Sequence, residues 1–157
     1  MKKFLKILVF LSFSTLLGCG FKVINQSEIS NFGIIDITTS GNKSINYKLK
    51  NKLLVSSKSN DKKLIKIFLD TTKTKKIKEK NIKNEITKYE ILISVNIKVK
   101  TINDQKSTNF SVLNSGDYSI NTKHSVSLRN EKKLIDLLTD ELSNEIINEL
   151  VLRIDDL

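Results

Sequence analysis

Every second residue between positions 91 and 99 is apolar and β-branched: Ile91, Ile93, Val95, Ile97 and Val99. Apart from Leu92, the residues between them are polar or basic. Because neighbouring side chains of a strand point to opposite faces of a sheet, this alternation predicts a strand, within residues 84–103, that is buried on one face only. Such a strand is typical of an antiparallel sheet with a single covered face.

Three other segments are predicted to be strands. Residues 32–38 are rich in β-branched side chains, and residues 62–77 show a two-residue period. Residues 109–123 keep their apolar side chains in one phase, and Gly116 within them is expected to mark a β-bulge. All four predicted strands therefore offer an apolar face for burial.

A first amphipathic helix is predicted over residues 43–55. Ile45, Leu49 and Leu53 recur there at a spacing of four, which places them on one helical face. The Ser-Gly-Asn segment at 40–42 precedes this helix, and we expect it to form a turn that supplies the N-cap.

A second, longer helix is predicted over residues 131–156. Ser127 or Asn130 is the expected cap, and Glu131 places an acidic side chain in the first turn. The apolar stripe of this helix is broad enough to cover a sheet. It consists of Leu134, Leu138, Leu142, Ile146, Leu150 and Ile154, widened by Ile135, Leu137, Ile147 and Val151.

The predicted order is strand–helix–strand–strand–strand–helix. Short connections make the last three strands an antiparallel meander, whereas the helix between the first two predicts a parallel crossover. An α+β two-layer sandwich, with two helices packed on one face of a mixed four-stranded sheet, buries each apolar face once. Residues 32–157 are therefore predicted to form a single domain.

The first twenty residues have the layout of a secretory signal peptide: a basic start, an apolar run and a small residue before Cys19. The Leu-x-Gly-Cys context of this cysteine resembles the lipobox of bacterial lipoproteins, which implies cleavage before Cys19 and its lipidation. A plain signal peptide or a membrane anchor is the alternative, but Lys6 limits the apolar run to 11 residues, and a spanning helix needs about 20. We predict a leader at 1–18 and a lipidated tether at 19–31.

The chain is basic, with a formal charge of +10. A basic surface favours polyanionic partners. Nucleic acid is excluded as the partner of an exported protein whose lysine-rich stretch lacks interleaved aromatic residues. The chain has no proline or tryptophan and is rich in lysine, asparagine and isoleucine, so the bias of an AT-rich genome is an alternative source of the charge.

Lysines cluster around the turn between the second and third predicted strands. They are Lys73, Lys75, Lys76, Lys78 and Lys80, followed by Lys83. Because crowded ammonium groups repel one another unless an anion lies among them, this cluster is a candidate phosphate-binding site. A solvated hairpin whose lysines reflect compositional bias is the alternative.

The sequence offers little for catalysis. Its one histidine, His124, is predicted to lie on the surface at the end of the fourth strand, without a local nucleophile or acidic partner. No glycine-rich phosphate loop occurs. Once Cys19 is lipidated, no cysteine remains for a His/Cys metal site. We therefore predict that the protein is not an enzyme and has no cofactor or metal.

Taken together, these features resemble the LptE family, the lipoproteins of lipopolysaccharide assembly in the outer membrane. The matching features are Gly18–Phe21 at the lipidation site, Tyr118–Asn121 in the last strand and a final helix dense in Leu, Ile and Glu. The chain departs from the family after Phe21, where Lys22-Val23-Ile24 replaces a Pro-Leu-Tyr-like segment.

The resemblance implies a lipoprotein of the outer membrane that faces the periplasm, plugs the large β-barrel translocon LptD, helps it to assemble and binds lipopolysaccharide. The lysine cluster would then meet the phosphates of lipid A. Leu64, Phe68 and Leu92, on the opposite face of the predicted sheet, are candidate contacts with the barrel. The alternative is a periplasm-facing regulatory or accessory lipoprotein: a pilotin, a peptidoglycan-synthase activator or a lipid-transporter subunit.

Overall fold

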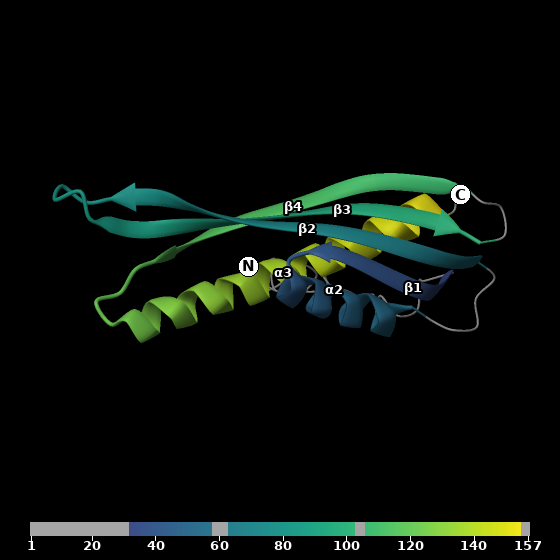
Figure 1. Ribbon diagram of the computed structural model, residues 1–157, viewed down its shortest axis with the longest axis horizontal. Coiled ribbons are helices and arrows are strands. Elements are labelled where there is room, and N and C mark those ends of the chain that lie inside the picture. Colours follow the sequence, from purple (N-terminus) through teal and green to yellow (C-terminus); the bar gives the residue numbers. More distant parts are fainter. Residues whose placement is uncertain (1–31, 58–62, 103–105, 155–157) are drawn as a thin grey trace, which may run out of the picture.

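The computed structural model describes residues 32–57, 63–102 and 106–154 (Figure 1). The elements, in chain order, are β1 (Phe32–Gly41), α2 (Lys43–Ser56), β2 (Lys63–Lys80), β3 (Ile86–Thr101), β4 (Ser107–Ser119) and α3 (His124–Ile154). The predicted leader, Cys19 and the tether lie outside the described residues. Among the helices of the described ranges, none combines the length and the apolar character needed to cross a membrane.

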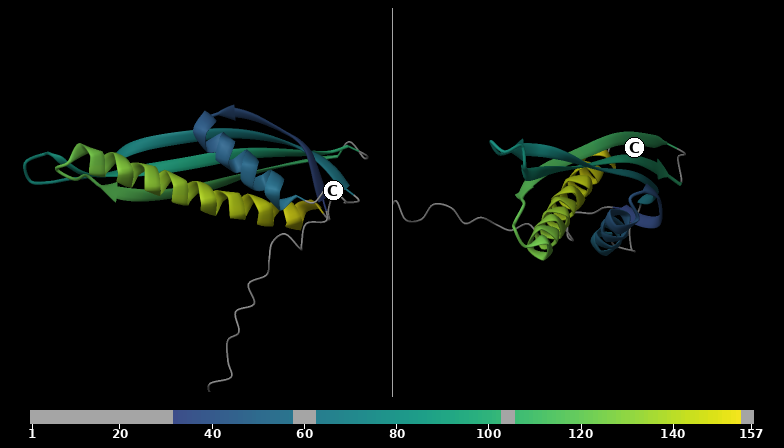
Figure 2. Two further views of the ribbon diagram at one scale, coloured as in Figure 1. Left: turned by 90° about the horizontal axis from the view of Figure 1, so that it is seen from below. Right: turned by 60° about the vertical axis from the view of Figure 1, so that its left-hand side comes forward.

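The strands form one sheet in the order β1-β2-β3-β4. β1 runs parallel to β2, whereas β2, β3 and β4 pair as antiparallel neighbours. Both helices lie on the same face of this sheet (Figures 1 and 2). The predicted α+β fold, with two helices on one face of a mixed four-stranded sheet, is therefore confirmed, and so is the parallel crossover through α2.

The hydrophobic core lies between the sheet and the helices. The five alternating apolar residues of β3 are all buried, and Asn96 and Lys98 between them are exposed. Leu142, Ile146 and Leu150 of α3 are buried in the same core. Burying one such side chain contributes about 1.5–3 kcal/mol. This one-sided burial fixes which face of each strand points inward.

The corner between β1 and α2 (residues 40–46) is attached to β2 by hydrogen bonds. The Asn42 side chain caps α2 by accepting the Ile45 N–H at 3.2 Å, as the sequence predicts. The Asn42 N–H donates to the carbonyl of Thr71 at 2.9 Å. The Thr71 hydroxyl donates to Asn46 Oδ1 at 2.6 Å. Thr71, in the middle of β2, therefore binds both the turn before α2 and the first helical turn of α2.

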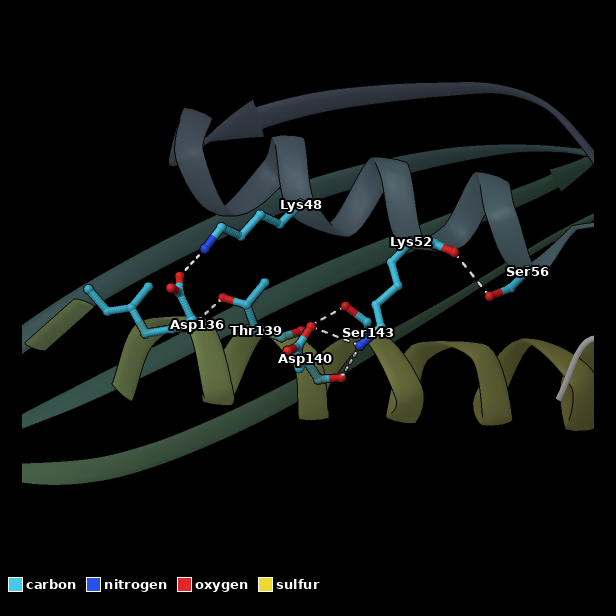
Figure 3. A network of polar contacts seen from close by, with 8 residues as sticks. Lys48, Lys52, Ser56, Asp136, Thr139, Asp140 and Ser143 are labelled. Carbon is cyan, nitrogen blue, oxygen red and sulfur yellow. Dashed lines mark hydrogen bonds and ion pairs between the residues drawn. The ribbon is translucent and has the colours of Figure 1, made fainter. Parts of the chain in front are cut away.

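Two lysine–aspartate pairs link α2 to α3 (Figure 3). Lys48 pairs with Asp136, and Lys52 Nζ lies 2.8 Å from Asp140 Oδ1. Because both partners advance by four residues from one pair to the next, the two helices run side by side in the same direction. The pairs are partly exposed, so each contributes at most about 1 kcal/mol. Their attraction offsets part of the repulsion between the dipoles of two helices that point in the same direction.

The buried stripe of α3 differs from the predicted one at two kinds of position. Leu137, expected to widen the stripe, is 54% exposed. Thr139 and Ser143 are buried, although a pattern of hydrophobic residues does not identify them. Their hydroxyl groups donate to backbone carbonyls one turn earlier, at 2.6 and 2.7 Å, so burial leaves neither hydroxyl without a partner.

The start of α3 was predicted wrongly. The helix begins at His124 instead of residue 131, and β4 is correspondingly shorter. A polar reversal separates the two elements: the Asn121 N–H donates to Ser127 Oγ at 2.8 Å, and the Ser127 N–H donates to the Lys123 carbonyl at 3.3 Å. These local hydrogen bonds satisfy the first helical turn before the apolar stripe begins. His124 is thus an exposed first residue of a helix and not the end of a strand.

Gly116 does not mark a bulge, so that prediction is also wrong. The pairing of β3 with β4 is uninterrupted from Lys88↔Ser119 to Lys100↔Ser107. A Cβ atom at Gly116 would lie 2.8 Å from Leu134 Cδ1 of α3. The glycine therefore allows a close approach of the helix to the sheet.

Candidate functional site

The predicted lysine cluster lies on a two-stranded arm, which we define as residues 73–90. It comprises the end of β2, the turn 81–85 and the start of β3. In Figure 1 this arm extends beyond the N-terminal end of α3, at the far left of the view. Its pairing contains register shifts between Ile77 and Glu79 and between Glu79 and Lys80. The tip of the arm therefore projects beyond the helices, whereas its base lies against α3 (Figure 1).

The tip of the arm is held by the side chain of Asn81. Its Oδ1 accepts the N–H groups of Lys83 and Glu85, each at 2.9 Å, and its Nδ2 donates to Glu85 Oε2 at 2.7 Å. Asn84 adopts a left-handed conformation, with φ of 63°, which asparagine tolerates better than most residues. Between these fixed positions Ile82 is fully exposed. The tip thus has a defined conformation although its side chains face solvent.

The structure divides the predicted lysine cluster between two faces and the tip. Lys73 and Lys75 pair with Ile93 and Ile91 of β3 and so share the helix-covered face. Lys76 and Lys78 lie on the opposite face, where Lys78 Nζ contacts Glu90 Oε1 at 3.1 Å. At the tip, Lys80 Nζ donates to Asn84 Oδ1 at 2.9 Å. The five candidate lysines therefore do not converge on one pocket.

Lys75 is the centre of a polar cluster that joins the arm to α3. Its Nζ lies 2.7 Å from Glu131 Oε2 and 4.3 Å from the centroid of the Tyr89 ring. The same carboxylate oxygen accepts the hydroxyl of Tyr118 at 2.7 Å. These residues, with His124 nearby, line a hollow of about 390 Å³. Lys75 therefore links the sheet to α3 through an ion pair that is still partly exposed.

The electrostatics of this cluster favour the ion pair. Burial disfavours the charged form of Lys75, but the hydrogen bonds and charges of Glu131 and Tyr118 together outweigh it and raise the pKa of Lys75. Burial likewise opposes ionisation of Glu131, but the hydrogen bonds from Lys75 and Tyr118 prevail and lower its pKa. Sequence analysis assigned Glu131 only to a helix terminus. Its tertiary role carries no local signal, because its partner Lys75 lies 56 positions away in the chain.

The change Glu131→Gln should reduce stability in a pH-dependent way. Because the folded-state pKa of Glu131 is lowered, its ionised form stabilises the fold above the unfolded-state value of about 4.3, and this contribution is lost as the pH falls through the lower folded-state value. We expect a cost of about 1–2 kcal/mol at pH 7, shrinking as the solution is acidified toward pH 3. Urea unfolding across this range measures it.

The matched control for Glu131→Gln is Glu145→Gln, an exposed position on the same helix. It should change the free energy of unfolding by no more than about 0.5 kcal/mol. A loss in Glu131→Gln that stays constant from pH 7 to pH 3 would contradict the role assigned to the Glu131 charge.

Because Lys75 is assigned to the fold, the other four candidate lysines are the ones available to bind an anion. Lys73, Lys76 and Lys80 are exposed, and the Lys78–Glu90 pair is a surface pair that contributes little. Exposed ammonium groups on a projecting arm can bind several phosphates as point charges. Cys19, the predicted lipidation site, lies outside the described residues.

Solved structures with a similar fold include bacterial lipoproteins. A candidate lipoprotein from Caulobacter crescentus has a TM-score of 0.59 at 12% identity, with 83% of this chain and 95% of that chain covered. An uncharacterised lipoprotein B from Nitrosomonas europaea has a TM-score of 0.53 at 12% identity, with 85% of this chain and 91% of that chain covered. At these identities the likeness establishes a shared fold alone. No protein-family model and no curated protein sequence matches the chain.

Proposed function

We propose that this protein is a lipid-anchored lipoprotein of the outer membrane that plugs a large β-barrel translocon similar to LptD. It assists the insertion of lipopolysaccharide into the outer leaflet and acts without catalysis. The observation that carries the proposal is the fold, which bacterial lipoproteins share over most of their length, following a lipobox at Cys19 in this sequence. Two or more acyl chains at such a cysteine give stable anchoring.

A translocon partner suits the surface of the domain. The interiors of large outer-membrane barrels are polar. The sheet face opposite the helices carries hydroxyl, amide and charged side chains, together with the exposed apolar side chains of Phe68 and Leu113. The outer side of α2 is rich in lysine and that of α3 in lysine and acidic residues, and both helices also expose apolar side chains, among them Val55 and Leu152. The polar part of such a surface can face a polar lumen, and the exposed apolar side chains are available for contacts with the barrel wall.

The arm supplies a contact for lipopolysaccharide in this proposal. Its exposed lysines are held on a projection with a fixed tip, and lipid A carries phosphate groups that ammonium groups bind. We assign Lys75 to the fold instead, because its ion pair with Glu131 is supported by Tyr118 and is less exposed than the pair of Lys78 with Glu90. The residues assigned to lipid A phosphates are therefore Lys73, Lys76, Lys78 and Lys80.

The test is a mild-detergent pull-down of the chain from native membranes, with the partner and the co-purifying lipopolysaccharide quantified. We expect one large outer-membrane β-barrel at a one-to-one ratio, and loss of membrane retention in Cys19→Ala. Changing Lys73, Lys76, Lys78 and Lys80 to serine should lower bound lipopolysaccharide several-fold while the barrel is retained. The matched control changes the exposed Lys43, Lys106, Lys132 and Lys133 to serine, with the same loss of charge.

Two results would overturn parts of this proposal. An inner-membrane or cell-wall enzyme as the stoichiometric partner would favour the regulatory or accessory class in place of the translocon. Equal loss of lipopolysaccharide in the arm variant and in its control would show that net charge, and not the arm, binds the phosphates.

A further inference from the structure

The face of the sheet opposite the helices is hollowed. Figures 1 and 2 show both helices on the other side, and no described element covers this face. Over its broad end, away from the arm, lies a hollow of about 620 Å³ lined by residues of all four strands. This volume falls within the range of small-molecule binding sites, about 300–1,000 Å³.

The strand registers arrange the lining of this hollow in two parallel rows. The first row crosses the sheet as Thr38, Phe68, Lys98 and Asn109. The second row crosses it as Ser40, Asp70, Asn96 and Ser111. Three interstrand spacings of about 4.8 Å make each row about 14 Å long. The hollow is therefore a groove that runs across the strands, and we call it the transverse groove.

The second row consists entirely of hydrogen-bonding groups. Ser40 Oγ donates to Asp70 Oδ1 at 2.6 Å, which orients the carboxylate. Within the described part of the chain, the amide of Asn96 has no side-chain hydrogen bond, and neither has the amide of Asn109 in the first row. Carboxylate and amide groups each present two hydrogen-bonding atoms in one plane. Such groups match pairs of neighbouring hydroxyl groups on a ligand.

The first row adds an aromatic ring to these polar groups. Phe68 is 38% exposed in the middle of the groove, with Lys98 as its cross-strand neighbour. Lys100 Nζ lies 5.9 Å from the centroid of its ring. Most of the exposed lining of the hollow is apolar, and hydroxyl, amide and charged groups lie beside this apolar surface, so the groove offers both kinds of contact to one ligand. Asp70 would repel a phosphate in the adjoining row.

We propose that the transverse groove binds a short oligosaccharide. Sugar rings present an apolar C–H face, which Phe68 can cover, and rows of hydroxyl groups, which Asp70 and Asn96 can bind. This site is separate from the lysines assigned to phosphate, and it does not rest on the proposed anchor or translocon. It requires only the exposed face of the folded chain.

The test is a calorimetric titration of the full chain in detergent micelles with two phosphate-free probes. One probe is chitotetraose, and the other is a lipopolysaccharide core oligosaccharide freed of lipid A and phosphate. We expect saturable binding of at least one probe, and the probe that binds identifies the source of the sugar. Asn96→Ala and Phe68→Ala should each weaken binding about tenfold, the effect of losing one good contact.

The matched control is Leu113→Ala, an exposed apolar residue on the same face of β4 but outside the two rows. It should leave the affinity unchanged, and circular dichroism checks that all three variants are folded. Asn96 is exposed, so its variant tests the groove even if Phe68→Ala loses stability. Absence of binding by both probes, or binding that all three variants retain equally, would overturn the proposal.

Discussion

Replacing Gly41 by alanine should destabilise the protein by at least about 3 kcal/mol, a large share of the 5–15 kcal/mol that holds a typical domain folded. Gly41 has φ of +84°, in the left-handed region that favours glycine. A Cβ atom there would lie 2.0 Å from the carbonyl oxygen of Thr71. That oxygen belongs to the backbone of a paired strand and cannot move aside. Urea unfolding followed by circular dichroism measures the loss.

Gly116→Ala is the matched control for this prediction. Its Cβ atom would also meet a neighbour closely, at 2.8 Å, but the neighbour is the end of the Leu134 side chain. A side-chain end can rotate away, so we expect a loss of only about 1 kcal/mol. If both variants lose the same stability, the close approach of Gly41 to the Thr71 carbonyl does not have the importance assigned to it.

Asn46→Ala should cost about 2–4 kcal/mol, although Asn46 lies on a short helix and is not part of the apolar core. Asn46 is 4% exposed and Thr71 is 1% exposed. The amide accepts the Thr71 hydroxyl at 2.6 Å and donates to the Ser40 carbonyl at 2.7 Å. Truncation leaves the buried Thr71 hydroxyl and the Ser40 carbonyl without these partners, and an unpaired buried hydroxyl is more costly than the loss of one exposed hydrogen bond.

A double-mutant cycle isolates this effect. Thr71→Val removes the orphaned hydroxyl, so the double variant Asn46→Ala/Thr71→Val should lose less stability than the sum of the single variants. Asn51→Ala, at an exposed position of the same helix, is the control and should be neutral or slightly stabilising, because alanine favours helix. Strict additivity in the cycle would contradict the coupling of Asn46 to Thr71.

The layers of the fold were predictable because burial on one side imposes a period on the sequence. The two-residue period of β3 and the four-residue stripe of α3 each identify an element and its inward face. The boundary at His124 was not predictable from that signal. No residue in the first turn of α3 is buried, and hydrogen bonds among Asn121, Lys123 and Ser127 fix this turn. The start of the helix therefore produces no hydrophobic period in the sequence.

The candidate site was predictable only as a location. The run of lysines correctly marks the projecting end of β2 and the turn that follows. Which lysine is neutralised depends on where α3 brings Glu131, and that is a long-range contact. The transverse groove has the same origin: Asp70, Asn96 and Ser111 are unremarkable polar residues in three separate strands until the register aligns them.

Because β1 pairs in parallel with β2, the strands are expected to join the sheet in a different order from the one in which they are synthesised. β2, β3 and β4 can pair through short turns as each strand appears, whereas β1 needs the crossover through α2 before it meets its neighbour. α2, with 14 residues, is marginal as an isolated helix in water. A chain that emerges from its amino end therefore presents β1 and α2 first and assembles them late, with Ile37, Ile45 and Leu49 in contact with solvent or a chaperone during the interval.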